Sequence, residues 1–84
     1  MAINVTDTYT VSSDNWEINI EFNYHHERAD WENPSYTETQ VIKVLLVSPD
    51  KNGLLVSTDI TDFYFEHLDS QYQEEVEEYA RDNY

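Results

Sequence analysis

Carboxylates are the side chains of this chain with the widest chemical repertoire: 18 Asp and Glu stand against four Lys and Arg. Two carboxyl groups catalyse glycoside hydrolysis when they lie roughly 5 to 9 Å apart across a cleft that separates their pKa values. A domain of 84 residues rarely encloses such a cleft, and the sequence contains no nucleophile motif and no phosphate-binding loop. We therefore expect that the protein is not an enzyme.

Two segments carry side chains that can bind metal ions. His25 and His26 precede Glu27 and Asp30, but neighbouring residues of an extended chain point to opposite sides, so only one histidine would join a given site. The segment 48–59, SPDKNGLLVSTD, places oxygen-bearing side chains at alternate positions before a glycine, as calcium-binding loops do. A hairpin turn accounts for the same residues, and we expect no metal and no cofactor.

Strands are the elements that must position these groups. Apolar residues alternate with polar ones over 16–24, and more weakly over 3–12, with the turn residues SSDN between the two runs. This pattern predicts an antiparallel hairpin. A third strand is expected over 39–48, with Ile42, Val44 and Leu46 on one face, and a fourth over 54–58 after a turn at Gly53.

The segment 25–36, HHERADWENPSY, has no periodicity and is expected to be a loop. Trp31 lies in this loop between Asp30 and Glu32, where no periodic pattern explains a large aromatic side chain. Two interpretations stay open. Trp31 either folds back to cover the open face of the sheet, or contacts a partner, since Trp and Tyr are enriched among the residues that dominate binding energy.

The remainder of the chain has helical patterns. A short helical turn is expected around 61–65, capped by Asp59 or Thr61, and a separate final helix is expected to start at Ser70, which forms a capping-box pattern with Gln73. The apolar stripe of this final helix consists of Tyr72, Val76, Tyr79 and Ala80. The sequence thus predicts a single α+β domain over 1–84, in which a four-stranded antiparallel sheet carries a C-terminal helix on one face (ββββα).

The opposite side of the final helix is acidic. Glu74, Glu77, Glu78 and Asp82 recur about once per turn, and Arg81 is expected to offset part of their repulsion by pairing with Glu77. Such a row of carboxylates can occupy a groove lined by Lys and Arg. A solvated face that only keeps the protein soluble is the alternative.

The net charge of −14 limits the kinds of partner. Phosphates are bound by Lys and Arg, so direct binding to nucleic acid or to anionic membranes is not expected. Basic protein surfaces are the favoured partners, and the commonest broad basic surfaces are those that hold nucleic acid. The sequence shows no signal peptide and no apolar run near the ~20 residues of a membrane span, so a cytoplasmic protein is expected.

The order of elements over residues 16–82 carries a resemblance. An acidic alternating strand, a proline-containing acidic loop, an apolar strand, a glycine turn, DITDF and the Glu-rich EEVEEYA resemble the short acidic proteins of unknown activity encoded by tailed bacteriophages. In charge and size the chain is similar to phage inhibitors that mimic DNA, such as the uracil-DNA glycosylase inhibitor and several anti-restriction and anti-CRISPR proteins. The resemblance implies the cytoplasm of a bacterial host as the setting.

These observations lead to one expected function and one alternative. The first is a phage-type accessory protein that inhibits or modulates a host nucleic-acid-binding or defence protein by occupying its basic surface. The alternative is a structural or assembly module without such mimicry, either a monomer or a homodimer that pairs through a sheet edge. The residues expected to bind the partner are Glu27, Asp30, Trp31, Glu32, Tyr36, Glu74, Glu75, Glu77 and Glu78.

Overall fold

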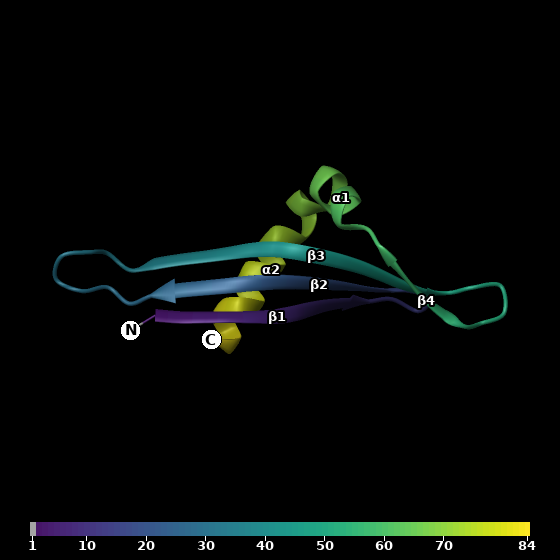
Figure 1. Ribbon diagram of the computed structural model, residues 1–84, viewed down its shortest axis with the longest axis horizontal. Helices are drawn as coiled ribbons and strands as arrows, with labels where there is room; N and C mark the ends of the chain where they lie inside the picture. The colour runs from purple at the N-terminus through teal and green to yellow at the C-terminus, as the bar shows by residue number, and fades with distance from the viewer. Residues whose placement is uncertain (1) are drawn as a thin grey trace.

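A computed structural model describes residues 2–84 and shows four strands followed by a helical segment (Figure 1). The strands are β1 (Ala2–Ser12), β2 (Glu17–Glu27), β3 (Tyr36–Pro49) and β4 (Leu55–Asp59). They form one antiparallel sheet in the order β1-β2-β3-β4. The helical segment consists of α1 (Thr61–Phe63), the π-helical turn η1 (Tyr64–Leu68) and α2 (Asp69–Asn83). The expected ββββα order and α+β class are confirmed.

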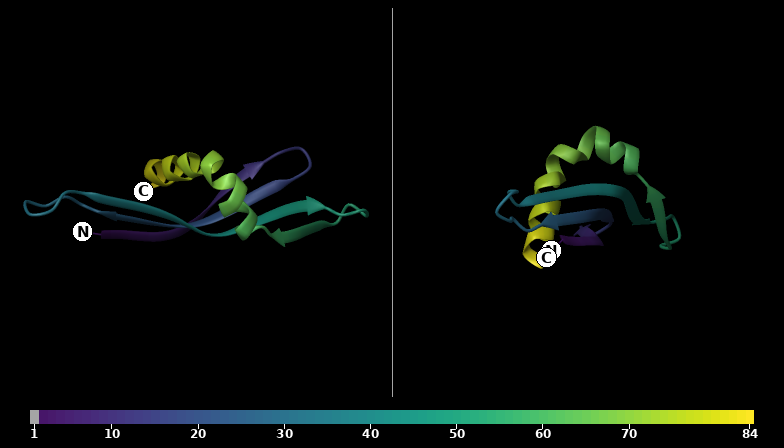
Figure 2. Two further views of the ribbon diagram at one scale, coloured as in Figure 1. Left: turned by 90° about the horizontal axis from the view of Figure 1, so that it is seen from above. Right: turned by 60° about the vertical axis from the view of Figure 1, so that its left-hand side comes forward.

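The hydrophobic core lies between the helix and one face of the sheet (Figure 2). On β2, alternation places Ile18, Ile20, Phe22 and Tyr24 on this face, and all four are buried. The helical segment contributes the other side of the core. Its buried residues are Tyr64, Tyr72, Val76 and Ala80.

The opposite face of the sheet has no element of residues 2–84 packed on it, and it faces the viewer in Figure 1. Its side chains on β1 and β2 are polar and bond across strands: the Thr6 hydroxyl donates to Asn23 Oδ1 at 2.6 Å and the Thr10 hydroxyl to Asn19 Oδ1 at 2.8 Å. Cross-strand pairs of this kind stabilise a sheet without a second layer. The structure therefore has two layers, one covered face and one wet face.

The expected alternation on β3 is wrong at one position. A β-bulge shifts the register, so that Glu21 pairs with Lys43 but Phe22 pairs with Val41. The extra residue, Ile42, is 39% exposed. Val41 is buried instead of Ile42. The inserted residue reverses the alternation, so odd-numbered rather than even-numbered residues face the core on the N-terminal side of the bulge.

The helical segment begins at Thr61, as expected for the short turn, but it continues into α2 without a break at Ser70. The expected cap at Asp59 or Thr61 is wrong, because the N-cap of α1 is Ile60 and no side chain makes a cap hydrogen bond. Asp59 instead accepts hydrogen bonds from the Thr61 N–H (2.9 Å) and hydroxyl (2.6 Å) just before the helix. Residues 62–69 contain neither Gly nor Pro, so nothing ends the helix before Ser70. The Ser70–Gln73 pattern therefore lies inside a helix and caps nothing.

The loop expected over 25–36 is shorter in the structure. β2 and β3 remain paired up to Glu27 and Tyr36, and only residues 28–35 lie outside the strands. The paired ends extend past the helix, as Figure 1 shows, so neither side of the hairpin needs apolar residues there. The molecule is elongated, 59 × 23 × 17 Å. No helix within residues 2–84 combines the length and the apolar character needed to cross a membrane.

Candidate protein-interaction surface

The acidic row of α2 faces solvent because the apolar stripe of the same helix faces the sheet. Glu74, Glu75 and Glu78 are exposed, and Glu77 is half-buried. Gln73 Nε2 donates a hydrogen bond of 3.0 Å to Glu77 Oε1 one turn later in the helix. The helix therefore presents its carboxylates outward on a rigid backbone.

Cations of the chain do not neutralise this row. Within residues 2–84 the ion pairs involve only histidines, His25 with Glu27 at 3.3 Å and His67 with Glu66 at 3.7 Å. The expected pair between Arg81 and Glu77 does not form. Glu77 is hydrogen-bonded to Gln73 on its N-terminal side, and the exposed Arg81 extends into solvent.

A depression lies where α2 meets β1, and its lining combines aromatic rings with acids. It has a volume of about 290 Å³ and is lined by Tyr9, Glu75, Glu78, Tyr79 and Asp82. The Tyr9 and Tyr79 rings are 5.3 Å apart between centroids and tilted by 51°. Burial, followed by the charge of Glu75, raises the pKa of Tyr9. Aromatic faces beside carboxylates are a favourable environment for an ammonium or guanidinium group.

The sequence did not assign this depression. Tyr9 and Tyr79 lie on core-facing parities, and periodicity shows which residues face inward but not which of them remain accessible at the margin of the core. Asp82 was recognised only as part of the acidic row. The structure brings Tyr9, Tyr79 and Asp82 together because the C-terminal end of α2 crosses β1 (Figure 2).

Trp31 does not cover the sheet: its side chain is 91% exposed at the tip of the β2–β3 hairpin. A defined turn holds it there. The Asp30 carboxylate accepts hydrogen bonds from the backbone N–H groups of Glu32 (2.8 Å) and Asn33 (2.7 Å), and the Asp30 N–H donates to the Asn33 carbonyl at 3.0 Å. These backbone hydrogen bonds lower the pKa of Asp30, which keeps the carboxylate charged and the turn closed.

Two further expected residues lie at the base of this hairpin. Glu27 and Tyr36 are directly paired across β2 and β3. Tyr36 is 50% exposed, and its hydroxyl donates to Glu38 Oε2 at 3.1 Å, which raises the pKa of Tyr36. This end of the hairpin therefore holds Glu27, Asp30, Trp31, Glu32 and Tyr36.

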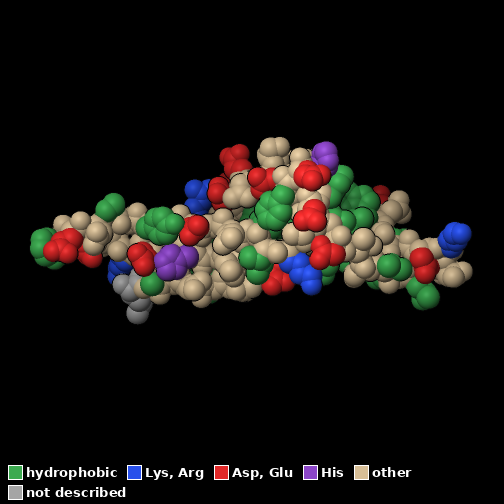
Figure 3. All heavy atoms as spheres, turned by 45° about the horizontal axis from the view of Figure 1, so that its top comes forward, with side chains coloured by type: hydrophobic (Ala, Val, Ile, Leu, Met, Phe, Trp, Pro, Cys, Tyr) green, Lys and Arg blue, Asp and Glu red, His purple; other side chains and the backbone are tan. Residues whose placement is uncertain are grey.

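The expected binding residues thus form two groups rather than one surface. The hairpin group lies at one end of the sheet, whereas α2 crosses the middle of it (Figure 1). Hydrophobic side chains also gather near the start of the helical segment, with acidic side chains among them (Figure 3). A partner must extend along the molecule to contact both groups.

Neither candidate metal segment forms a ligand cluster. His25 pairs with Glu27, whereas His26 Nδ1 lies 2.9 Å from the Thr37 hydroxyl, and the two rings belong to opposite faces of β2. In the 48–59 segment the Asp50 carboxylate accepts the N–H groups of Asn52 and Leu54. Within residues 2–84 there is no group of three or more His, Asp or Glu placed to hold a metal ion.

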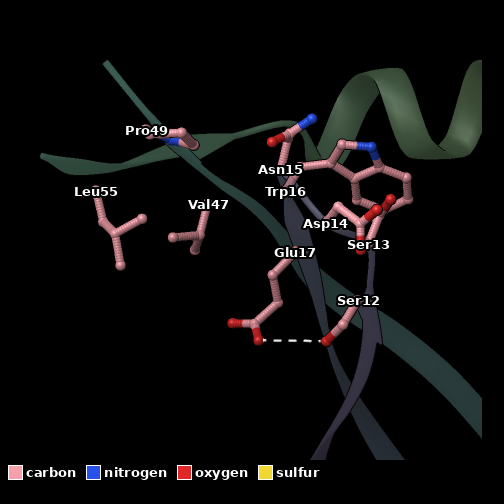
Figure 4. Close-up of a pocket in the computed structure, with 9 residues that line it drawn as sticks. All are labelled: Ser12, Ser13, Asp14, Asn15, Trp16, Glu17, Val47, Pro49 and Leu55. Atoms are coloured by element: carbon pink, nitrogen blue, oxygen red, sulfur yellow. Dashed lines mark hydrogen bonds between the residues drawn. The ribbon is translucent and has the colours of Figure 1, made fainter. Parts of the chain in front are cut away.

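A further pocket, of about 370 Å³, lies between the β1–β2 turn and β4 (Figure 4). Its polar side contains Ser12, whose hydroxyl donates a long hydrogen bond of 3.5 Å to Glu17. Its apolar side consists of Val47, Pro49 and Leu55. No histidine is among its lining residues, so the Ser12 hydroxyl has no imidazole base beside it.

Comparisons of this chain with protein-family models, with curated proteins and with solved structures find no match.

Proposed function

We propose that this protein binds the basic surface of a nucleic-acid-binding protein in place of nucleic acid, and thereby inhibits or modulates that protein. The observation that carries the proposal is the row of outward carboxylates on α2 that no Lys or Arg of residues 2–84 neutralises. Mutual repulsion among these groups lowers the stability of the free protein. A surface rich in Lys and Arg relieves this repulsion when it binds.

The average charge density along α2 is close to that of a nucleic acid strand. Fifteen residues of α2 span about 22 Å at ~1.5 Å per residue. Six acids lie on this length, namely Asp69, Glu74, Glu75, Glu77, Glu78 and Asp82. One negative charge per about 4 Å compares with one phosphate per ~3.4 Å along a single DNA strand. The match supports a groove that normally holds a phosphate backbone as the binding site of α2.

Aromatic side chains supply contacts that charge alone does not. The depression beside Tyr9 and Tyr79 accommodates a Lys or Arg side chain of the partner, with the acids of α2 around it. Trp31 adds a large apolar surface at the hairpin tip, with Tyr36 at its base. We assign fast, salt-sensitive encounter to the acids of α2 and selectivity to these aromatic residues. A host defence protein is the partner class implied by the resemblance to phage inhibitors.

A charge-matched pair of variants tests the proposal. The first replaces Glu74, Glu75, Glu77 and Glu78 by Gln. The second removes the same number of charges away from the helix, with Asp14→Asn and with Glu17, Glu21 and Glu38 each replaced by Gln. Circular dichroism verifies that both variants fold.

The binding partner is first captured from a bacterial lysate with the wild-type protein and identified, and its affinity for each variant is then measured with purified proteins. We expect the helix variant to bind several-fold more weakly and the control to bind nearly as well as wild type. Equal losses of affinity in the two variants would show that binding depends on net charge and not on the acids of α2. Unchanged binding of the helix variant would refute the proposal.

A further inference from the structure

The outer edge of β4 is an unpaired strand edge. Antiparallel partners exchange backbone hydrogen bonds at alternate residues. The Ile60 N–H donates to the Val44 carbonyl at 2.9 Å, and the Asp50 N–H donates to the Leu54 carbonyl at 2.8 Å. The even-numbered residues of β4 therefore bond to β3. The N–H and C=O groups that point away from the sheet belong to Leu55, Ser57 and Asp59.

The other edge of the sheet, on β1, is protected. The Ser13 N–H donates to the Trp16 carbonyl at 2.8 Å, so the even-numbered residues of β1 point their backbone groups outward. In the middle of this edge the Thr8 N–H donates to Asp7 Oδ1 at 2.7 Å. The same carboxylate accepts the Tyr84 hydroxyl. The Asp7 carboxylate thus occupies an outward N–H in the middle of the edge and also places a charge there, and both discourage another strand from pairing.

No carboxylate accepts an outward N–H in the middle of β4, and the one charged residue of this strand, Asp59, lies at its C-terminal end. Leu54, Leu55 and Val56 are 66%, 75% and 45% exposed. Leu55 lies beside Val47 and Pro49 in the pocket of Figure 4. The segment 48–59 contains two acids, Asp50 and Asp59, and one base, Lys51, so it carries a charge of only −1 in a chain whose net charge is −14. Two copies can approach here with less repulsion than at the acidic helix.

We propose that β4 pairs antiparallel with β4 of a second copy of this chain. With a two-fold axis at Ser57, Leu55 and Asp59 of one copy face Asp59 and Leu55 of the other. All three outward-pointing residues of each strand are then hydrogen-bonded. The two Asp59 carboxylates lie at opposite ends of this pairing, each opposite a Leu55 and each bound by Thr61 of its own chain, so they do not face each other. The product is a continuous eight-stranded sheet whose two helices carry the acidic rows.

The length of β4 and the charge of the chain set how the pair forms. Five residues make a small interface, so the pair forms at high protein concentration and dissociates on dilution. Salt screens the repulsion between two molecules that each carry −14, so self-association strengthens as salt rises. Binding of a basic partner by α2 weakens with salt instead. The two proposals can therefore fail independently.

Sedimentation equilibrium over a wide concentration range tests the pair at about 0.15 M and about 0.5 M salt, where screening differs strongly. Ser57→Pro removes an outward N–H and leaves the β3–β4 hydrogen bonds intact. Thr10→Pro makes the same change on the protected β1 edge. We expect wild type and Thr10→Pro to dimerise, more tightly at high salt, and Ser57→Pro to remain monomeric. Monomeric wild type, or Ser57→Pro that dimerises as wild type does, would overturn the proposal.

Cysteine cross-linking locates the interface independently of the proline variants. The chain contains no Cys, so one introduced thiol forms a disulfide only between molecules. In the proposed pair the two Ser57 Cα atoms lie about 5.5 Å apart, within the range that a disulfide spans. Under mild oxidation Ser57→Cys is expected to give a covalent dimer, and Thr10→Cys is not. Equal cross-linking at the two positions, or none at residue 57, would contradict pairing through β4.

Discussion

At the residue scale, the least satisfied group of the core is the hydroxyl of Tyr64. The Tyr64 side chain is fully buried, and its hydroxyl has no hydrogen-bond partner among residues 2–84. Burial, followed by the negative charge of Asp69, raises the pKa of Tyr64 to about 12. Removal of a buried, unpaired polar group abolishes a desolvation cost and leaves the aromatic ring in place.

Tyr64→Phe is therefore expected to raise the free energy of unfolding by about 1 kcal/mol. Urea denaturation followed by circular dichroism measures the change. Tyr72→Phe is the matched control, since the Tyr72 ring is also in the core but its hydroxyl is not an unpaired buried group. A loss of stability in Tyr64→Phe that exceeds the loss in Tyr72→Phe would show that the Tyr64 hydroxyl contributes to the fold.

The pKa of Tyr64 also predicts how stability changes in alkaline solution. The unfolded chain releases the Tyr64 proton near pH 10, whereas the folded chain retains it until about pH 12. Between these values the folded state binds more protons, so the free energy of unfolding falls as the pH rises. The Tyr64→Phe variant lacks this contribution. Its unfolding free energy, measured from pH 9 to about pH 11.5, is expected to fall less steeply than that of wild type, and parallel curves would contradict the assignment.

At the element scale, the Asp7 carboxylate makes the β1 edge different from the β4 edge, because it accepts the outward N–H of Thr8. Asp7→Ala frees the Thr8 N–H and is expected to increase association through β1, which static light scattering measures. Asp7→Asn is the control, because it removes the same charge but keeps a side-chain oxygen that accepts the Thr8 N–H. If the two variants associate to the same extent, charge rather than the hydrogen bond protects this edge.

Patterns within single elements gave both the most accurate and the least accurate predictions of the fold. Alternation from Ile18 to Tyr24 predicted β2 correctly as a half-buried strand, because each of these side chains meets one face of one sheet. The bulge at Ile42 could not be predicted, since it depends on pairing with β2 rather than on the β3 sequence. The Ser70–Gln73 pattern failed because a capping pattern acts only where a helix begins, and the residues before Ser70 already form one.

The candidate site was predicted to a similar degree. The outward position of Glu74 and Glu78 followed from the helical stripe opposite them. The exposure of Trp31 depends on the turn that Asp30 closes, and the depression at Tyr9 depends on where α2 crosses the sheet. Both are tertiary features that no local pattern specifies.

At the scale of the whole molecule, unneutralised charge dominates. Ion pairs within residues 2–84 involve only histidines, while the chain carries a net charge of −14. Salt screens this self-repulsion more in the compact folded state than in the expanded unfolded chain. The melting temperature is therefore expected to rise between about 0.05 M and about 0.5 M sodium chloride.

The variant with four Gln residues on α2 provides the comparison for this prediction. With fewer repelling carboxylates, it should melt higher than wild type at low salt and gain less from added salt. Differential scanning calorimetry measures how steeply the melting temperature of each protein rises with salt. Identical slopes would mean that the acids of α2 do not destabilise the free protein.

The central claim is that α2 occupies a surface that otherwise holds nucleic acid. The most direct measurement is competition: the complex with the identified partner is titrated with duplex DNA at about 0.1 M salt, and binding is also measured at about 0.5 M, where the Debye length falls from ~10 Å to less than half of that. The account predicts that DNA displaces this protein and that the higher salt weakens the complex. A partner that binds DNA and this protein simultaneously, with an affinity insensitive to salt, would contradict it.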